Sequence, residues 1–158
     1  MGWSEPSLDN HFLSHHIDIV RTSYNHWMDR DLAPSNVSGS DIARWFYHAP
    51  FVLLSHDTHP DPLFNYANLS AQNLFEMDWA TFVTTPSRLS AEPAVLDDRQ
   101  KLLEEVAANG FIKNYRGIRM TASGKRFWIE EAVVWNLFDR DGQYYGQAAL
   151  FERWRWVD

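Results

Sequence analysis

The last third of the chain constrains the fold most, because it reads as three consecutive long strands. Aromatic and β-branched residues are frequent in residues 111–121, 125–138 and 143–157. Two short turns, residues 122–124 and 139–142, separate these segments, and each contains a Gly, which tolerates the positive φ that a hairpin turn requires. The pattern predicts an antiparallel meander against which the rest of the chain packs.

Helices and a short hairpin are predicted upstream of this meander. Apolar residues at helical spacing predict a first helix that Ser7 caps and that ends before Pro34. A second, shorter helix is predicted within residues 40–49. Two apolar runs, residues 51–55 and 63–67, lie too close together in the sequence for a helical crossover, so we expect them to pair as a hairpin.

A third substantial helix is predicted between the hairpin and the meander, after short helices that follow Asn68. It begins at Ser90 and ends at Gly110, because a left-handed glycine closes the last helical turn at low cost. The inward stripe of this helix is expected to consist of Val95, Arg99, Leu102, Leu103 and Val106.

Together these elements predict an α+β fold with a single five-stranded antiparallel sheet and short helices on one face of the sheet. Residues 1–49 are interpreted as an N-terminal helical extension, and residues 50–158 as the domain that contains the sheet. The sequence shows no repeat and no boundary between the two parts, so we expect them to form one structural unit.

The charge and composition exclude several classes of function. The formal net charge is -7, which argues against a nucleic-acid surface and against attraction to anionic membranes. The chain contains no cysteine, so disulfides, thiolate nucleophiles and a covalent cysteinyl–flavin adduct are excluded. No apolar run has membrane-spanning length, and the first residues lack a signal-peptide pattern. We therefore expect a cytoplasmic protein without nucleic-acid or membrane partners.

The order of elements and several short segments resemble the PAS fold. Residues 61–68 are similar to the PAS strand that enters the first helix with an Asn, and residues 124–149 contain segments similar to the PAS C-terminal meander. The sequence resembles the MEKHLA family, a PAS-related domain, still more closely. The segments that carry this closer resemblance are residues 53–57, 64–68, 86–93, 115–119, 134–136 and 146–149. The resemblance implies a sensory or ligand-binding module and transfers no catalytic residue.

Pairing with the PAS meander suggests which side chains of the long central strand face the helices. It points Glu130, Ala132, Val134 and Asn136 toward them. A buried carboxylate is costly unless it is paired, and Arg88, Arg99 or Arg119 could pair with Glu130. A cavity with convergent polar groups would bind a small molecule, whereas a closed structural network is the alternative. The predicted ligand-binding residues are Asn65, Arg88, Arg119, Glu130, Asn136 and Gln147.

The opposite side of the same strand is too apolar to face water. Alternation places Ile129, Val133, Trp135 and Leu137 there, and the last strand presents a similar face. We expect either the first helix to pack on this face or a second subunit to cover it as a homodimer.

The leading hypothesis is a sensory or ligand-binding module that acts in signalling through partner or homodimer contacts, without catalysis. Its cofactor is unknown: residues 68–110 contain no His that could ligate haem, whereas a non-covalent flavin or an organic acid stays possible. One alternative is an enzyme of the NTF2 type, in which His56 with Asp57 or Asp61 would act as a general base. Another is a purely structural dimerisation module. No metal site is predicted.

Overall fold

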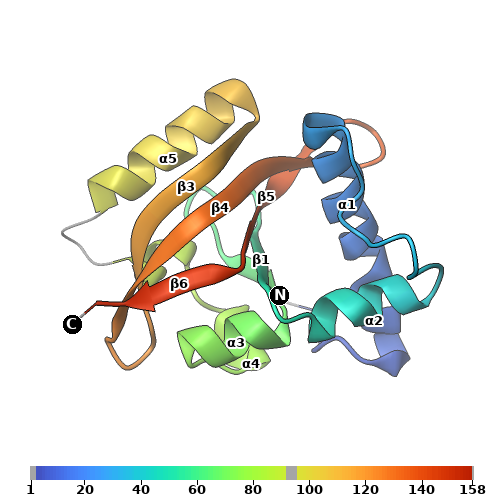
Figure 1. Ribbon diagram of the computed structural model, residues 1–158, viewed down its shortest axis with the longest axis horizontal. Helices are drawn as coiled ribbons and strands as arrows, with labels where there is room; N and C mark the ends of the chain where they lie inside the picture. The colour runs from blue at the N-terminus through green and yellow to red at the C-terminus, as the bar shows by residue number, and fades with distance from the viewer. Residues whose placement is uncertain (1–2, 92–95, 158) are drawn as a thin grey trace.

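A computed structural model describes residues 3–91 and 96–157, which form one antiparallel sheet flanked by helices (Figure 1). The spatial order of the strands is β2-β1-β5-β4-β3, and β6 pairs with β4. These elements confirm the predicted α+β class, the short hairpin of β1 and β2, and the C-terminal meander. The strands are β1 (Val52–His56), β2 (Phe64–Ala67), β3 (Phe111–Met120), β4 (Arg126–Phe138), β5 (Tyr144–Phe151) and β6 (Arg153–Trp156).

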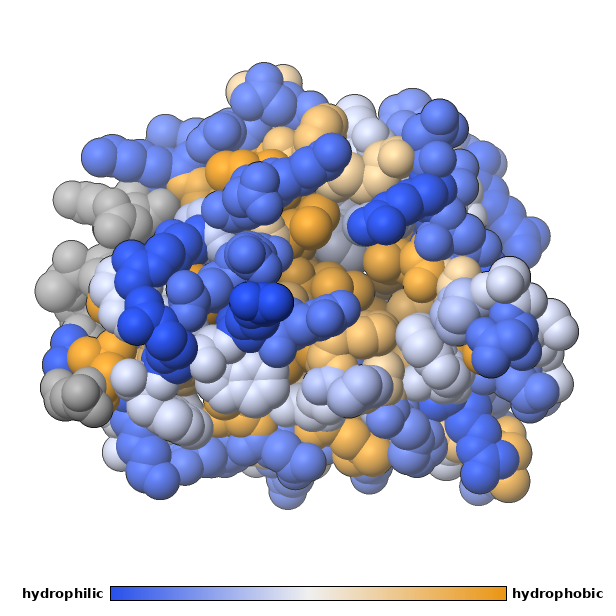
Figure 2. Space-filling view, viewed as in Figure 1, coloured by the Kyte–Doolittle hydropathy of each residue, from blue (hydrophilic) through white to orange (hydrophobic). Residues whose placement is uncertain are grey.

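Helices cover both faces of this sheet. The inner face is the one that contacts α3, α4 and α5, and the outer face is the one that contacts α1 and α2. Seen in space-filling view, one side of the molecule is largely polar, with hydrophobic residues in a hollow near its centre (Figure 2). The helices are η1 (Leu8–Leu13), α1 (Ser14–Met28), α2 (Asp41–His48), α3 (Leu69–Phe75), α4 (Trp79–Phe82), η2 (Ser87–Ser90) and α5 (Leu96–Asn109).

The last strand is divided into β5 and β6, although the sequence predicted one strand. Both parts pair with β4, and the break falls beside Glu131, which has a left-handed φ of 55°. A left-handed residue inside a strand adds a bulge, and a one-residue bulge reverses the alternation of side chains beyond it. Ala132 and Val134 face inward as predicted, but Ile129 also faces inward and Glu130 faces outward. The predicted orientations of these last two residues are therefore wrong.

The first predicted helix also contains a break. Residues His11, Phe12 and Leu13 have φ values of 54°, 52° and 56°, so η1 ends there and α1 starts at Ser14. A left-handed conformation costs a non-glycine residue about 1–2 kcal/mol. The break turns the Phe12 side chain into the core, where it is 9% exposed. Burial of this aromatic ring offsets part of the backbone cost.

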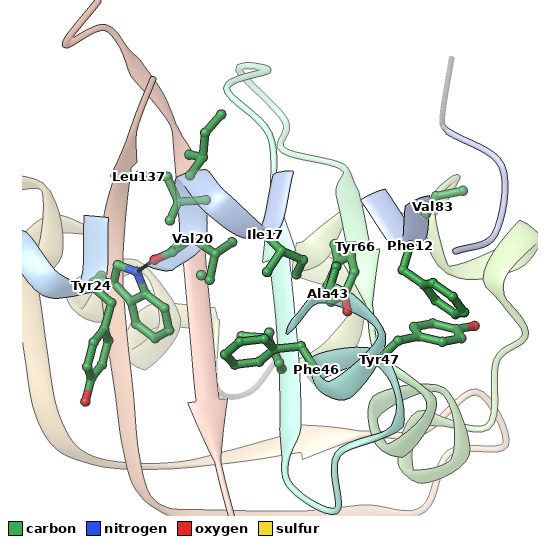
Figure 3. Packing of buried hydrophobic residues seen from close by; sticks show 14 of the residues in the cluster. Phe12, Ile17, Val20, Tyr24, Ala43, Phe46, Tyr47, Tyr66, Val83 and Leu137 are labelled. Atoms are coloured by element: carbon green, nitrogen blue, oxygen red, sulfur yellow. Dashed lines mark hydrogen bonds between the residues drawn. The ribbon is translucent and has the colours of Figure 1, made fainter. Parts of the chain in front are cut away.

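The outer face is covered by α1, which confirms the first of the two predicted arrangements. Ile17, Val20 and Tyr24 pack against the sheet, and Figure 3 shows these three side chains in one cluster with Phe46 from α2. Trp135 of β4 donates its Nε1–H to the carbonyl of Val20 at 3.3 Å. The first two helices therefore share a core with the sheet.

The long helix of the middle segment starts later than predicted. Residues Ser87–Ser90 form the short helix η2, and α5 begins at Leu96. Val95, which was assigned to the inward stripe, lies outside the described residues. Gly110 ends the helix as predicted, with a φ of +89° and an N–H that donates to the carbonyl of Val106 at 2.7 Å.

Gly110→Ala is expected to lower the free energy of unfolding by more than about 1 kcal/mol, since the left-handed φ disfavours any Cβ. A Cβ would also lie 2.3 Å from the ring of Trp27. Gly142→Ala is the matched control, because Gly142 has a φ of +76° but open space around it. Urea unfolding followed by circular dichroism measures both losses. Equal losses would show that the Trp27 ring moves aside without cost.

Candidate functional site

A cavity of about 80 Å³ lies between the inner face of the sheet and the helices that cover it. Its wall is mostly apolar, with side chains from the sheet, α3 and α5. The sequence folds this way because inward positions of β4 and β5 are small or aliphatic and leave room beneath the helices. The apolar lining residues are Leu54, Phe64, Phe75, Leu102, Leu103, Ile129, Ala132, Val134, Ala148, Ala149 and Phe151.

Two arginines supply positive charge to this cavity. Arg119 of β3 donates to the carbonyl of Ile118 at 2.8 Å and to the Tyr115 hydroxyl at 3.3 Å. Arg99 of α5 donates to the hydroxyl of Ser87. Burial, followed by the neighbouring Arg119 charge, lowers the pKa of Arg99. Within the described residues neither arginine forms an ion pair, so their charges favour an anion in the cavity.

Two buried acceptor atoms line the same cavity without a hydrogen-bond partner. His56 bonds through Nδ1 to the carbonyl of Asp57 at 3.0 Å, and a carbonyl only accepts. The Nδ1 atom therefore carries the proton, and Nε2 of the neutral ring is an acceptor. Gln147 donates its amide to Oδ1 of Asn136 at 3.1 Å, which leaves its own Oε1 free. Among described atoms, His56 Nε2 and Gln147 Oε1 have no partner.

The charge state of His56 follows from its surroundings. Burial is the largest effect and lowers the pKa of this histidine. The Arg99 charge acts in the same direction, while Asp57 and the neighbouring Gln147 side chain act against it without reversing the shift. The ring is therefore neutral at pH 7, and its Nε2 lone pair is available to a donor.

Of the six predicted ligand-binding residues, Arg119 and Gln147 line the cavity. Asn136 lies behind Gln147 and positions its amide. Two residues outside the predicted set also line it: Arg99, which was expected on the inward stripe of the long helix and as a partner for a carboxylate, and His56, which was considered as a general base. His56 and Gln147 are cross-strand neighbours in β1 and β5, so their side chains face the same side of the sheet. The predicted inward position of Gln147 could therefore have indicated that His56 also faces the cavity.

The other three predicted residues lie away from the cavity. Arg88 pairs with Asp61 at 3.1 Å, and the two side chains are 51% and 53% exposed. Glu130 accepts a bond from Arg155 at 2.6 Å on the outer side of the bulge. Asn65 accepts a bond from Ser55 at 2.6 Å, because a register shift between β1 and β2 turns it out of the inner face. Their assignment to the cavity is therefore wrong.

Asn65 ends a buried hydrogen-bond chain on the outer face. Tyr145 donates to Nδ1 of His16 at 3.1 Å, His16 Nε2–H donates to Ser55 at 2.9 Å, and Ser55 donates to Asn65. This direction is fixed because Ser55 has a single proton, which it gives to Asn65. Burial, aided by the His15 charge, lowers the pKa of His16 to about 3, so the chain holds a neutral histidine.

The His–Asp pair of the alternative enzyme hypothesis does not form. The Asp57 carboxylate accepts the backbone N–H groups of His59 at 3.1 Å and Leu63 at 3.0 Å and so shapes the loop. Asp61 pairs with Arg88. Neither carboxylate orients the ring of His56, whose Nδ1 bonds a backbone carbonyl. This geometry gives no support to a general base in this loop.

A groove of about 530 Å³ opens on the outer side of the sheet. Its apolar lining includes Leu32, Trp45, Phe51, Val133 and Leu150. Charged residues, among them Arg30, Asp31, Glu130 and Arg153, stand around it. In Figure 2 hydrophobic surface is visible in the central hollow between polar side chains. No helix in the described parts of the chain is long and apolar enough to span a bilayer.

Comparison with solved structures defines the fold class. The PAS domain of a protein from Colwellia psychrerythraea aligns over 73% of this chain and 92% of that chain, with a TM-score of 0.60 and 14% identity. A light-oxygen-voltage domain studied with a flavin analogue covers 78% and 89%, with a TM-score of 0.58 and 13% identity. The PAS domain of a LuxR-family regulator from Burkholderia thailandensis, in complex with ethanol, covers 68% and 92%, with a TM-score of 0.53 and 16% identity. The protein has the fold of PAS and light-oxygen-voltage sensory domains.

The family can be stated as well. The model of the MEKHLA domain matches residues 14–156, so the chain belongs to the MEKHLA domain family. The resemblance seen in the sequence is thereby confirmed. A search of curated proteins found no match.

Proposed function

We propose that this protein is a cytoplasmic sensory module that binds a small molecule in the inner-face cavity and acts through partner or homodimer contacts, without catalysis. The observation that carries the proposal is the pair of unpartnered buried acceptors, His56 Nε2 and Gln147 Oε1, beside two arginines that form no ion pair among the described residues. Buried polar groups are normally hydrogen-bonded, and exceptions require an explanation. A bound ligand is an explanation that accounts for all four polar groups.

The size of the cavity restricts the ligand. Pockets for drug-sized ligands occupy roughly 300–1,000 Å³, whereas this cavity measures about 80 Å³. A flavin would require the helices to move outward. A ligand of a few heavy atoms fits the arrangement better, and the ethanol complex of a PAS domain is a precedent for a ligand of that size in this fold.

The decisive test is native mass spectrometry on freshly purified protein. We expect a retained small molecule in the wild type and its loss in Ala149→Met, which fills the cavity from β5. Ala122→Met is the matched control, because Ala122 is exposed in the turn after β3. A stable dimer that retains nothing, and that no added compound stabilises, would favour the structural dimerisation module instead.

The outer-face groove is the proposed contact for a second copy or another protein. Val133→Lys is expected to shift the protein toward the monomer in size-exclusion chromatography with light scattering, since a charge on an apolar contact is costly. Ile118→Lys is the control on the same face, outside the groove. Dissociation by both variants to the same degree, or by neither, would contradict this contact.

A further inference from the structure

The polar groups of the cavity are of two opposite kinds, and this determines the chemistry that fits. Arg99 and Arg119 can only donate hydrogen bonds. His56 Nε2 and Gln147 Oε1 can only accept them in the state that the structure fixes. A ligand that pairs with both kinds must therefore carry an acceptor of negative charge and a donor, and only a donor with two or more protons satisfies both acceptors.

The two acceptors lie side by side and their orientation is held from behind. His56 and Gln147 are register partners in β1 and β5, and such neighbours have Cβ atoms about 4.5–5.5 Å apart. Asn136 donates its amide to the carbonyl of Val106 at 3.2 Å, so its Oδ1 accepts from the Gln147 amide. Gln147 is 5% exposed and cannot turn its Oε1 to solvent. The carbonyl of Asp57 fixes the proton of His56 in the same way.

The two donors, the guanidinium groups of Arg99 and Arg119, are also held in place by hydrogen bonds. The neighbouring Tyr115 and Ser87 hydroxyls and a backbone carbonyl hold the guanidinium groups but do not neutralise them. Guanidinium groups match the geometry of a carboxylate, which can accept two parallel bonds. The Arg99 charge also acts on His56, which places the cationic and accepting parts of the cavity within electrostatic reach of each other.

On the basis of the proposed function, we propose that the cavity binds a short-chain carboxylate that carries a hydroxyl or ammonium group next to the carboxylate. The carboxylate lies against Arg99 and Arg119. An ammonium group donates to both His56 Nε2 and Gln147 Oε1, whereas a hydroxyl has a single proton and donates to one of them. The hydrocarbon part contacts the apolar wall formed by side chains such as Ile129.

The first experiment is isothermal titration calorimetry of the wild type with four probes of similar size: L-lactate, L-alanine, propionate and 1,2-propanediol. We expect lactate or alanine to bind at least about tenfold more tightly than propionate, because propionate leaves both buried acceptors unpaired. The diol lacks the carboxylate and is expected not to bind measurably. Which of lactate and alanine binds more tightly identifies the donor as a hydroxyl or an ammonium group.

Variants assign the two halves of the ligand to the two halves of the cavity. Arg119→Gln is expected to weaken lactate and propionate alike by about tenfold or more, since a charged hydrogen bond is lost. Gln147→Leu is expected to weaken lactate and leave propionate unchanged, which a merely structural role would not produce. Arg140→Gln is the control, because Arg140 is exposed in the turn between β4 and β5 and does not line the cavity. If Gln147→Leu unfolds, His56→Phe tests the same half.

Two outcomes overturn the inference in different ways. Equal affinity for propionate and the two donor-bearing acids, or unchanged binding in Arg119→Gln, contradicts the ligand class. If none of the four probes binds while native mass spectrometry shows another retained molecule, the ligand class is wrong and the proposed function stands. If no probe binds and nothing is retained, both fail.

Discussion

Trp135→Ala is expected to lower the free energy of unfolding by about 3–5 kcal/mol. Trp135 is fully buried, and its ring stands edge to face with that of Tyr24 at a centroid distance of 5.0 Å. Its Nε1–H bonds the carbonyl of Val20. The substitution leaves a cavity between β4 and α1 that the surrounding helices fill only in part. Urea unfolding followed by far-ultraviolet circular dichroism gives the loss without relying on tryptophan fluorescence.

Trp156→Ala is the matched control for this prediction. Trp156 is 51% exposed at the end of the sheet, and its ring centroid lies 5.8 Å from that of Phe127. We expect a loss below about 1 kcal/mol, as for most surface substitutions. Limited proteolysis should cut α1 faster in Trp135→Ala than in either the wild type or the control. Similar losses in the two variants would show that α1 contributes little to stability.

Acidification from pH 7 to pH 5 is expected to lower the free energy of unfolding by about 2 kcal/mol through His16 alone. The pKa of His16 is about 3 in the folded protein, against 6.5 as its ordinary value. Below pH 6.5 His16 therefore binds a proton in the unfolded chain but stays neutral in the folded protein. Stability from this group is complete above about pH 6.5 and falls as the pH drops toward 3. His56 acts in the same direction, since its pKa is also lowered.

Urea unfolding at several pH values between 7 and 5 measures this dependence. This pH range lies above that in which carboxylates with lowered pKa values, such as Glu76, become protonated, so their contribution does not obscure that of the histidine. His16→Gln is expected to be less stable at pH 7 and to lose the part of the slope that His16 contributes, about 2 kcal/mol between pH 7 and pH 5, while the part from His56 remains. His59→Gln, at an exposed position in the β1–β2 loop, should keep the slope of the wild type. The same slope in all three proteins would contradict a neutral buried His16.

Local patterns in the chain were enough to predict the sheet and the main helices. Periodicity and turn residues identified the meander, the hairpin and the stop at Gly110, and the apolar outer side of β4 predicted a covering helix. These features depend on neighbours in the sequence, so they can be recognised without coordinates. The breaks at residues 11–13 and at Glu131 could not be recognised from the sequence, because tertiary packing holds ordinary residues in left-handed conformations there.

The cavity shows the same limit. Gln147 lines the cavity and Asn136 lies behind it, because both follow the alternation of strands whose inner faces were predicted. Arg119, named only as a possible partner for a buried carboxylate, lines the cavity as well. Glu130 was misplaced because one left-handed residue reverses the alternation beyond it. Arg88 was misplaced because a charged side chain on a connecting segment can reach several partners, and here the exposed Asp61 is nearest.

The sequence by itself determined the family, the antiparallel sheet and the need to cover both of its faces, since these follow from residue pattern and hydrophobicity. Only the tertiary structure decided which polar groups meet on the inner face. His56, Arg99, Arg119 and Gln147 come from four different elements, and their meeting depends on strand register and on one bulge. Register and bulges are set by packing between distant segments, and no local pattern records them.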